Sequence, residues 1–220
     1  MPREFDGAND EIGFGSDASI DSFTQRSFLA WVRHDAGDGV FITKLGARLT
    51  ANATPLYVVG AQWSGSFAEW SGPAPSSGNW EAVAFSYDGA DIANDPVLYV
   101  NGVSQTLTET TAPSGTYTDD AADALIIGET SGGFVDLDGA AAFLVYTDGI
   151  LTAADVNRHR WWGCAPGGPS TMKVWHPLLN SDLTNKGTAV ADGTATGTTV
   201  AAMSQPKVER MWGSMMGCGR

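Results

Sequence analysis

The stretch NWEAVAFSYDGADIANDPVLYVNG, residues 79–102, decides the fold class of this chain. An apolar run ends in Tyr-Asp-Gly, and a second, shorter run ends in Asn-Gly, the strongest short signal for a β-hairpin. We expect the Asp-Gly and Asn-Gly pairs to supply the positive φ angles that tight turns need. Strands this short are not stable alone, so the stretch predicts a sheet with many antiparallel neighbours.

The same pattern of short apolar runs and turn residues extends on both sides. We expect strands at residues 26–34, 38–46, 54–63, 66–72, 79–89, 95–102, 123–129, 139–149 and 171–178. Only residues 151–163 have a helical pattern, with Thr152 as the N-cap and Asp155 three positions on. The chain is therefore predicted to be all-β, a two-sheet antiparallel jelly-roll sandwich with one short helix near residues 152–162.

Charge and hydropathy exclude several functions. The 220 residues carry 12 basic and 25 acidic side chains, a net charge of −13, and residues 49–157 contain neither Lys nor Arg. Without a basic stripe to neutralise phosphates, nucleic acid is not an expected partner. No apolar run is long enough to span a membrane, and the first residues lack the apolar core of a secretion signal.

The two cysteines, Cys164 and Cys218, have no zinc-site spacing, and the sequence leaves open whether they are paired or free. Three tryptophans fall within residues 61–80. Trp80 starts an expected core strand. Trp63 and Trp70 flank a Ser-Gly-Ser turn, where each could either stack on a glycan or pack inside. These two are the glycan-binding candidates.

Six motifs in order resemble the concanavalin A-like lectin and glucanase domains of the laminin-G-like type. They are FDGANDEIGFG, FLAWVRH, WEAVAFSYDG, LYVNG, LIIGE and LDGAAAFLVYTDGILTAADV, and they cover about residues 4–160. The matching positions are Trp80, Tyr87, Asp88, Gly89, Tyr99, Asn101, Gly102, Gly128, Gly139, Tyr146 and Leu151. The resemblance implies the same jelly roll.

The resemblance also raises catalysis and calcium as expectations to weigh. Glucanases with this fold place Glu-x-Asp-x-x-Glu on one strand, and that run is absent; the nearest carboxylate pair is Asp136 and Asp138. Laminin-G-like domains often hold one calcium ion, for which the acidic segments 88–95 and 118–123 are the candidates. Because the catalytic run is absent, we expect no enzyme. Since neither acidic segment has a full ligand pattern, we also expect no metal and no cofactor, with calcium as the alternative.

Residues 174–200 resemble a segment that follows this domain in bacteriophage structural proteins. That likeness predicts a non-enzymatic virion protein, a head decoration or a tail or fibre component, located in the virion and able to bind glycans. The alternative is a stand-alone carbohydrate-binding module of a cell-surface or secreted protein. A glycoside hydrolase is the third reading.

The chain is divided here into a sandwich, residues 1–165, and a C-terminal strand-and-arm extension, residues 166–220, that packs on the same domain or on a neighbour. The end of the extension combines basic and apolar side chains, which suits docking on an acidic surface. The expected partners are the capsid shell or tail and further copies of this chain. The anchoring candidates are Lys207, Arg210, Met211, Trp212, Met215, Met216 and Arg220.

Overall fold

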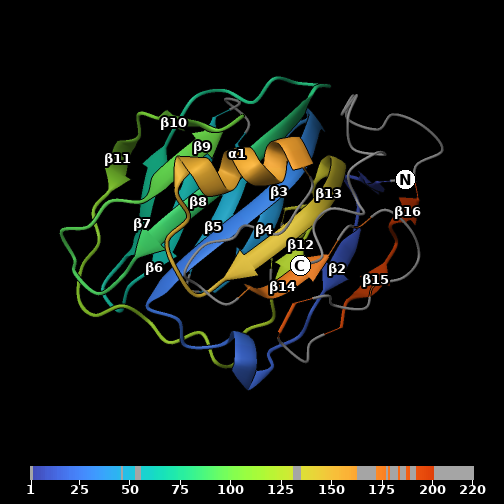
Figure 1. Ribbon diagram of the computed structural model, residues 1–220. Coiled ribbons are helices and arrows are strands. Elements are labelled where there is room, and N and C mark those ends of the chain that lie inside the picture. The colour runs from blue at the N-terminus through green and yellow to red at the C-terminus, as the bar shows by residue number, and fades with distance from the viewer. Residues whose placement is uncertain are drawn as a thin grey trace.

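The computed structural model describes residues 2–45, 47–52, 56–130, 135–162, 172–176, 178, 183, 187, 188 and 192–200. These residues form two eight-stranded sheets, and every strand pairing among them is antiparallel (Figure 1). The predicted jelly-roll sandwich is confirmed. The first sheet contains β1 (Arg3–Asp6), β3 (Gln25–Ala36), β8 (Trp80–Asp88), β9 (Val97–Val100), β10 (Val103–Gln105), β13 (Asp138–Thr147), β14 (Met172–His176) and β16 (Thr199–Val200). The second contains β2 (Glu11–Gly13), β4 (Gly39–Lys44), β5 (Ala47–Ala51), β6 (Tyr57–Gln62), β7 (Phe67–Ser71), β11 (Thr108–Thr111), β12 (Ile126–Ile127) and β15 (Thr194–Thr196).

Strand β13 organises the first sheet, whose order is β10-β9-β8-β3-β13-β1-β16. Along one side it pairs with the long strand β3, with Ala141 opposite Val32 and Tyr146 opposite Phe28. Its other side pairs with two strands that lie one after the other: β1 along the first half of β13 and β14 along the second half. The register shifts in the middle of β13, close to Phe143, whose φ of +54° is unusual for a residue other than glycine.

The second sheet has the order β11-β7-β6-β5-β4-β12-β2-β15 and packs face to face with the first. Side chains from both sheets alternate into one large shared core, as expected for an aligned sandwich. Its largest apolar and aromatic members, all less than 2% exposed, are Trp70, Tyr57, Tyr87, Tyr146, Phe14, Phe28 and Phe85.

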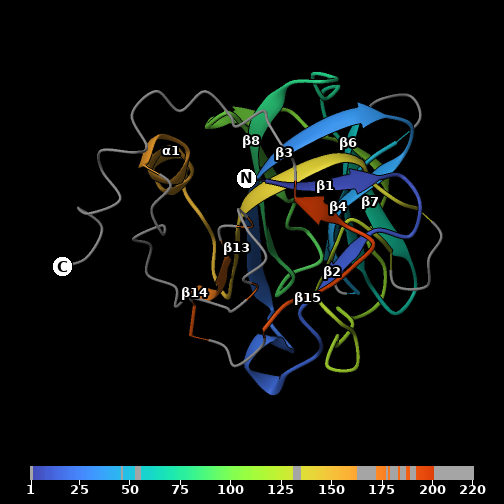
Figure 2. The same cartoon turned by 90° about the vertical axis from the view of Figure 1, so that its right-hand side faces the viewer.

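One α-helix, α1 (Ala153–Trp162), covers the outer face of the first sheet, so that helix, first sheet and second sheet form successive layers (Figure 2). It begins where the sequence predicts. Thr152 N donates to Asp155 Oδ2 at 2.9 Å and Asp155 N donates to Thr152 Oγ1 at 3.3 Å, which is a capping box. Val156 then packs on Leu29 and Val145 of the sheet.

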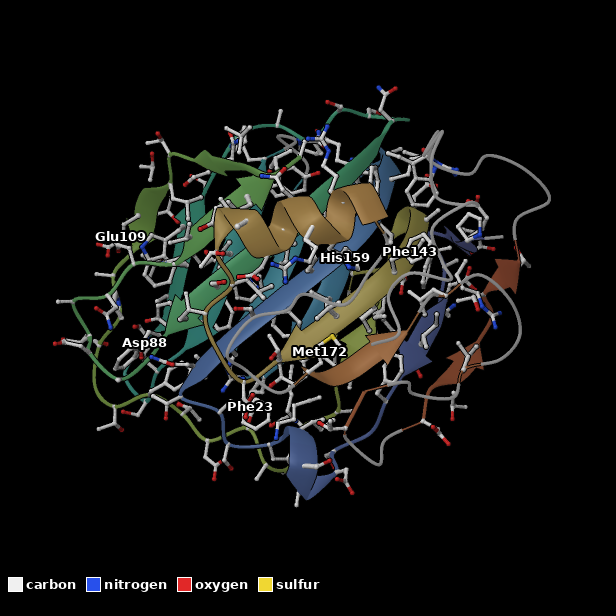
Figure 3. The ribbon with its side chains drawn as sticks, in the orientation of Figure 1. Phe23, Asp88, Glu109, Phe143, His159 and Met172 are labelled. Atoms are coloured by element: carbon white, nitrogen blue, oxygen red, sulfur yellow. The ribbon has the colours of Figure 1, made fainter. Side chains whose placement is uncertain are left out.

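Deeper along the helix, His159 is fully buried, with Nε2 lying 2.9 Å from the carbonyl oxygen of Phe143 (Figure 3). The contact ties α1 to β13 at its irregular point. A short 3₁₀ helix, η1 (Ala18–Ile20), lies between β2 and β3. Within the described residues, no helix is both long enough and apolar enough to cross a membrane.

The two turns predicted within residues 79–102, at Asp88-Gly89 and at Asn101-Gly102, have different outcomes. Asn101 and Gly102 have φ angles of +53° and +79°, so the hairpin between β9 and β10 forms as predicted. The prediction for Gly89 is wrong, because its φ is not positive. A Cβ at Gly89 would instead lie 2.7 Å from the ring of Tyr117. Because that ring lies so close, only glycine fits at position 89 without a shift of its neighbours.

Three described strands belong to residues 166–220. β14 pairs with β13, β15 with β2, and β16 with β1, so these strands extend both sheets of the same chain. The proposed domain boundary falls among residues 163–171, which lie outside the described residues. The two-part division of the chain stays a prediction.

Candidate functional site

The two tryptophans expected as glycan-stacking residues are buried. Trp63 is 3% exposed and donates from Nε1 to the Tyr87 hydroxyl at 3.2 Å; Trp70 is 1% exposed and donates to Asp95 Oδ1 at 2.8 Å. Both belong to the core between the sheets. The prediction that they stack on a glycan is therefore wrong, since neither indole face is open to solvent.

Trp80 also departs from expectation. It begins β8 as predicted, but its side chain lies half-buried on the outer face of the first sheet, beside Trp31 and Phe143. The guanidinium of Arg33 lies 5.8 Å from its ring. Trp80 is thus not part of the core between the sheets.

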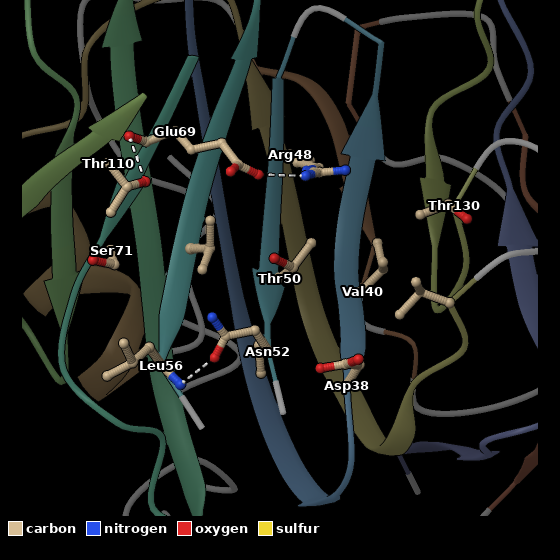
Figure 4. A pocket seen from close by; sticks show the side chains of 13 residues that line it. Asp38, Val40, Arg48, Thr50, Asn52, Leu56, Glu69, Ser71, Thr110 and Thr130 are labelled. Carbon is tan, nitrogen blue, oxygen red and sulfur yellow. Dashed lines mark hydrogen bonds and ion pairs between the residues drawn. The ribbon is translucent and has the colours of Figure 1, made fainter. Parts of the chain in front are cut away.

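A groove of about 440 Å³ opens on the outer face of the second sheet (Figure 4). It crosses β4, β5, β6 and β7 and reaches β11. Its lining combines charged, hydroxyl, amide and aliphatic side chains. They are Asp38, Val40, Arg48, Thr50, Ala51, Asn52, Leu56, Val58, Glu69, Ser71, Thr110, Thr130 and Val135.

Strand register sets the middle of the groove. Thr50 of β5 pairs with Val58 of β6, which pairs with Ser71 of β7, so the three side chains stand in a row across the sheet. Successive residues of a strand point to opposite faces, and their neighbours Leu49, Val59 and Trp70 fill the core. The row therefore points away from the core. Val58, 8% exposed, lies between the two hydroxyl side chains.

The next row along the strands forms one wall. Arg48 of β5, Gly60 of β6 and Glu69 of β7 stand opposite one another. Arg48 Nη2 donates to Glu69 Oε1 at 2.7 Å across the glycine, and both side chains are 32% exposed (Figure 4). The Arg48 guanidinium also lies over the ring of Phe67, 4.2 Å from its centroid. This contact is a cation–π interaction.

Gly60 makes this wall possible. A Cβ at that position would lie 2.4 Å from Phe67 Cε1 and 3.1 Å from Arg48 Cγ. Any side chain there would displace the phenyl ring on which the guanidinium rests. The ion pair thus depends on a position with no side chain at the centre of a strand.

Sequence reasoning missed these groove residues, although part of the signal was present. In FAEWS, residues 67–71, the buried residues Ala68 and Trp70 alternate with the partly exposed Phe67, Glu69 and Ser71. That period of two indicates that Trp70 faces inward. The strand holding Arg48, Ala47–Ala51, was not predicted at all.

In the acidic segment 118–123, one of the two considered for calcium, two carboxylates bond to other residues of the chain. Asp120 is fully buried, and it pairs with Arg26 and accepts from Ser22 N at 2.8 Å. Asp119 accepts from Ser22 Oγ at 2.7 Å, and this hydrogen bond holds the pKa of Asp119 below its usual value. Among the described residues, no group of three His, Cys, Asp or Glu side chains is placed to hold a metal ion.

Neither Asp136 nor Asp138 lines the groove. Asp138 begins β13, and Asp136 forms an isolated bridge with Glu129. The partner-anchoring candidates and the two cysteines lie outside the described residues: Lys207, Arg210, Met211, Trp212, Met215, Met216, Arg220, Cys164 and Cys218.

Comparison with solved structures identifies relatives in fold. A candidate carbohydrate-binding protein from Bacteroides ovatus superposes with a TM-score of 0.69 at 14% identity, over 94% of this chain and 61% of that one. The heptameric SAP-like pentraxin from Limulus polyphemus gives a TM-score of 0.61 at 15% identity, over 93% of this chain and 95% of that one. Mouse laminin α1 domains LG4-5 give 0.47 at 13% identity, over 66% and 40%.

No family model matches the sequence, and no curated protein matches it. This chain spans less than two thirds of the Bacteroides ovatus protein. None of the three structures is described as a bacteriophage component. Strand order and the superpositions on the Bacteroides ovatus and Limulus polyphemus proteins agree that the chain has the concanavalin A-like fold, a two-sheet antiparallel jelly roll with one short helix.

Proposed function

We propose that this chain is a non-catalytic carbohydrate-binding module and that the groove on the second sheet holds the glycan. The main support is the row at its centre, where the hydroxyls of Thr50 and Ser71 stand on either side of Val58. Neither hydroxyl has a hydrogen-bond partner among the described residues. The groove thus offers free hydroxyls around an aliphatic floor.

Saccharides match this arrangement. A sugar ring presents hydroxyl groups at its edge and C–H groups on its faces, and it needs a partner for each kind of surface. Ligand sites generally combine apolar lining with a few polar groups that fix orientation. Here Val58 and Leu56 supply the apolar part, and Asn52 and Glu69 add polar groups beside the two hydroxyls.

The spacing of the strands that carry the two lining carboxylates supports binding without hydrolysis. Asp38, which precedes β4, and Glu69 of β7 are the two carboxylates that line the groove. Three strand spacings separate their chain segments, about 14 Å at ~4.8 Å per spacing. Glycosidases hold their carboxylate pairs about 5–9.5 Å apart. Among the described lining residues, the strand spacing therefore gives no support for a hydrolytic carboxylate pair.

The bacteriophage virion role, as head decoration or tail or fibre component, receives no support from the structures compared. The likeness to a candidate carbohydrate-binding protein favours the alternative predicted from sequence, a carbohydrate-binding module. That likeness concerns the fold, so the proposal for function rests on the groove.

A steric block tests the proposal. Thr50→Trp places an indole in the middle of the groove, and Ser104→Trp makes a comparable change at the exposed edge strand β10 of the other sheet. Both proteins are applied to a broad glycan array together with the wild type, after thermal melts establish that each is folded.

We expect the wild type and Ser104→Trp to give the same glycan signals and Thr50→Trp to lose them. Retention of full binding by a folded Thr50→Trp protein would place the glycan elsewhere. Absence of signal from the wild type across the array would count against the function itself.

A further inference from the structure

Although the groove contains an arginine, its charged side chains do not make it positively charged. Arg48 is the one positively charged side chain among the described residues that line it, and Glu69 lies 2.7 Å away as its ion-pair partner. Asp38, exposed at the far end of the groove, has no hydrogen bond or ion pair among the described residues. The described lining residues therefore carry one net negative charge, and the positive charge of Arg48 is balanced by Glu69.

The position of Arg48 reinforces this compensation. Its guanidinium lies on the Phe67 ring, and one end is fixed by Glu69. An incoming carboxylate or sulfate would approach a guanidinium that already lies 2.7 Å from a carboxylate of the same sign. Repulsion by Glu69 therefore offsets much of the attraction of Arg48 for an anionic group.

The surrounding chain adds negative potential. Residues 49–157 contribute most of the groove lining and contain no Lys or Arg, within a chain of net charge −13. A surface with one sign of charge repels ligands of that sign and lowers their local concentration. Anionic ligands are disfavoured both at a distance and on contact.

We infer that the groove selects uncharged saccharides over acidic ones, and that Glu69 acts as the charge filter by neutralising Arg48. This inference rests on the proposed carbohydrate-binding function and adds the class of saccharide. Asp38 and the Thr50 and Ser71 hydroxyls accept or donate hydrogen bonds to sugar hydroxyls without requiring a charge on the ligand. Carboxylate- and sulfate-bearing glycans are disfavoured as long as the Arg48–Glu69 pair is intact.

The test uses one array that carries neutral glycans and glycans with carboxylate or sulfate groups, read at fixed ionic strength. The proteins are the wild type, Glu69→Gln and Glu109→Gln. Gln at position 69 keeps the size of the side chain but removes the negative charge that compensates Arg48. Glu109 is exposed on β11 and does not line the groove, so Glu109→Gln controls for the change in net charge.

We expect wild-type signals on neutral glycans to exceed those on acidic glycans by tenfold or more. Glu69→Gln should gain acidic glycans at least tenfold relative to the wild type, and Glu109→Gln should not. Strongest wild-type binding to acidic glycans, or an equal gain in both variants, would overturn the charge filter while the binding function stands. A wild type that binds no glycan of either class would overturn the proposed function and this inference with it.

Discussion

The indole nitrogen of Trp63 donates a hydrogen bond to the hydroxyl of Tyr87 across 3.2 Å, deep in the core. Trp63 follows β6 in the second sheet and Tyr87 belongs to β8 in the first, so the bond joins the two layers. The sequence suggests Trp63 as a surface residue for stacking on a glycan, but in the structure it connects the two sheets inside the core. Without it, both groups would lack a hydrogen-bond partner among the described residues, and a buried unpaired polar group is costly.

Trp63→Phe should keep much of the bulk and remove this donor. We expect a loss of about 1–3 kcal/mol in the free energy of unfolding, measured by denaturant titration, since the Tyr87 hydroxyl loses its donor in the core. Burial raises the pKa of Tyr87 to about 12, and the bond from Trp63 opposes that rise. The variant should therefore show a still higher pKa for Tyr87. A stability equal to the wild type would mean that the bond contributes nothing.

All five tyrosines have pKa values raised by burial, so stability should fall at alkaline pH. In the unfolded chain a phenol loses its proton near pH 10, whereas in the native protein it keeps it. Stability is then fully present below about pH 10 and is lost as the pH rises toward the folded values, about 12 for Tyr87. Ultraviolet titration should show phenolate appearing together with unfolding. Reversible ionisation near pH 10 in the folded protein would contradict this.

Trp70 and Trp80 should differ in their contribution to stability. Trp70→Ala empties a fully buried site, so we expect a loss of about 3–5 kcal/mol in denaturant melts. Trp80→Ala should cost clearly less, because that ring is half-buried on the outer face. Equal losses would indicate that the outer aromatic cluster is as important as the core.

The buried pair of Arg26 and Asp120 offers a further test. Their side chains are 1% and 0% exposed. Asp120→Ala leaves the guanidinium charge without its carboxylate, and we expect a loss of about 3–5 kcal/mol. Asp119→Ala, on the exposed neighbouring residue, should cost about 1 kcal/mol or less. Similar losses in the two variants would show that the loop is stabilised by something other than the buried pair.

Asp10→Asn should stabilise the protein at neutral pH. Burial, together with the nearby charges of Asp6 and Asp136, raises the pKa of Asp10. An acid with a raised folded pKa destabilises the native state when ionised, and stability returns as the pH falls through that pKa. Asn keeps an oxygen that can accept from Asp6 N, as Asp10 Oδ2 does at 2.8 Å. The melting temperature should rise at pH 7 and match the wild type below about pH 4. A lower melting temperature at pH 7 would contradict the argument.

Local signals were enough where one segment determines its own conformation. The Asn101-Gly102 hairpin and the capping box of Thr152 and Asp155 depend on neighbours in sequence, and both formed as expected. Gly89 was misread, because its reason is a ring from a distant segment, Tyr117. The preferences of residues for turn positions depend on neighbours in sequence, so they cannot predict a contact with a distant segment.

The groove could not be predicted because no single segment contains it. Arg48 and Glu69 meet only when β5, β6 and β7 pair in one register, with a glycine between them. A shift of one residue would turn these side chains toward the core. Trp63 and Trp70 were predicted as glycan-stacking candidates because they are aromatic residues near a turn. The alternation within residues 67–71, which that prediction did not use, indicates that Trp70 faces inward.

The pairing of β1 has a consequence for synthesis on the ribosome. Arg3 faces Ala141 on one side and Val200 on the other, so within the described residues β1 pairs with strands that lie much later in the chain. Contacts this distant in sequence slow folding, because a long loop must close before they form. A nascent chain that stops before β13 would leave β1 without either of these partners, exposing its backbone edge to other chains. Of the described strands, the earliest in the chain is therefore among the last to be paired.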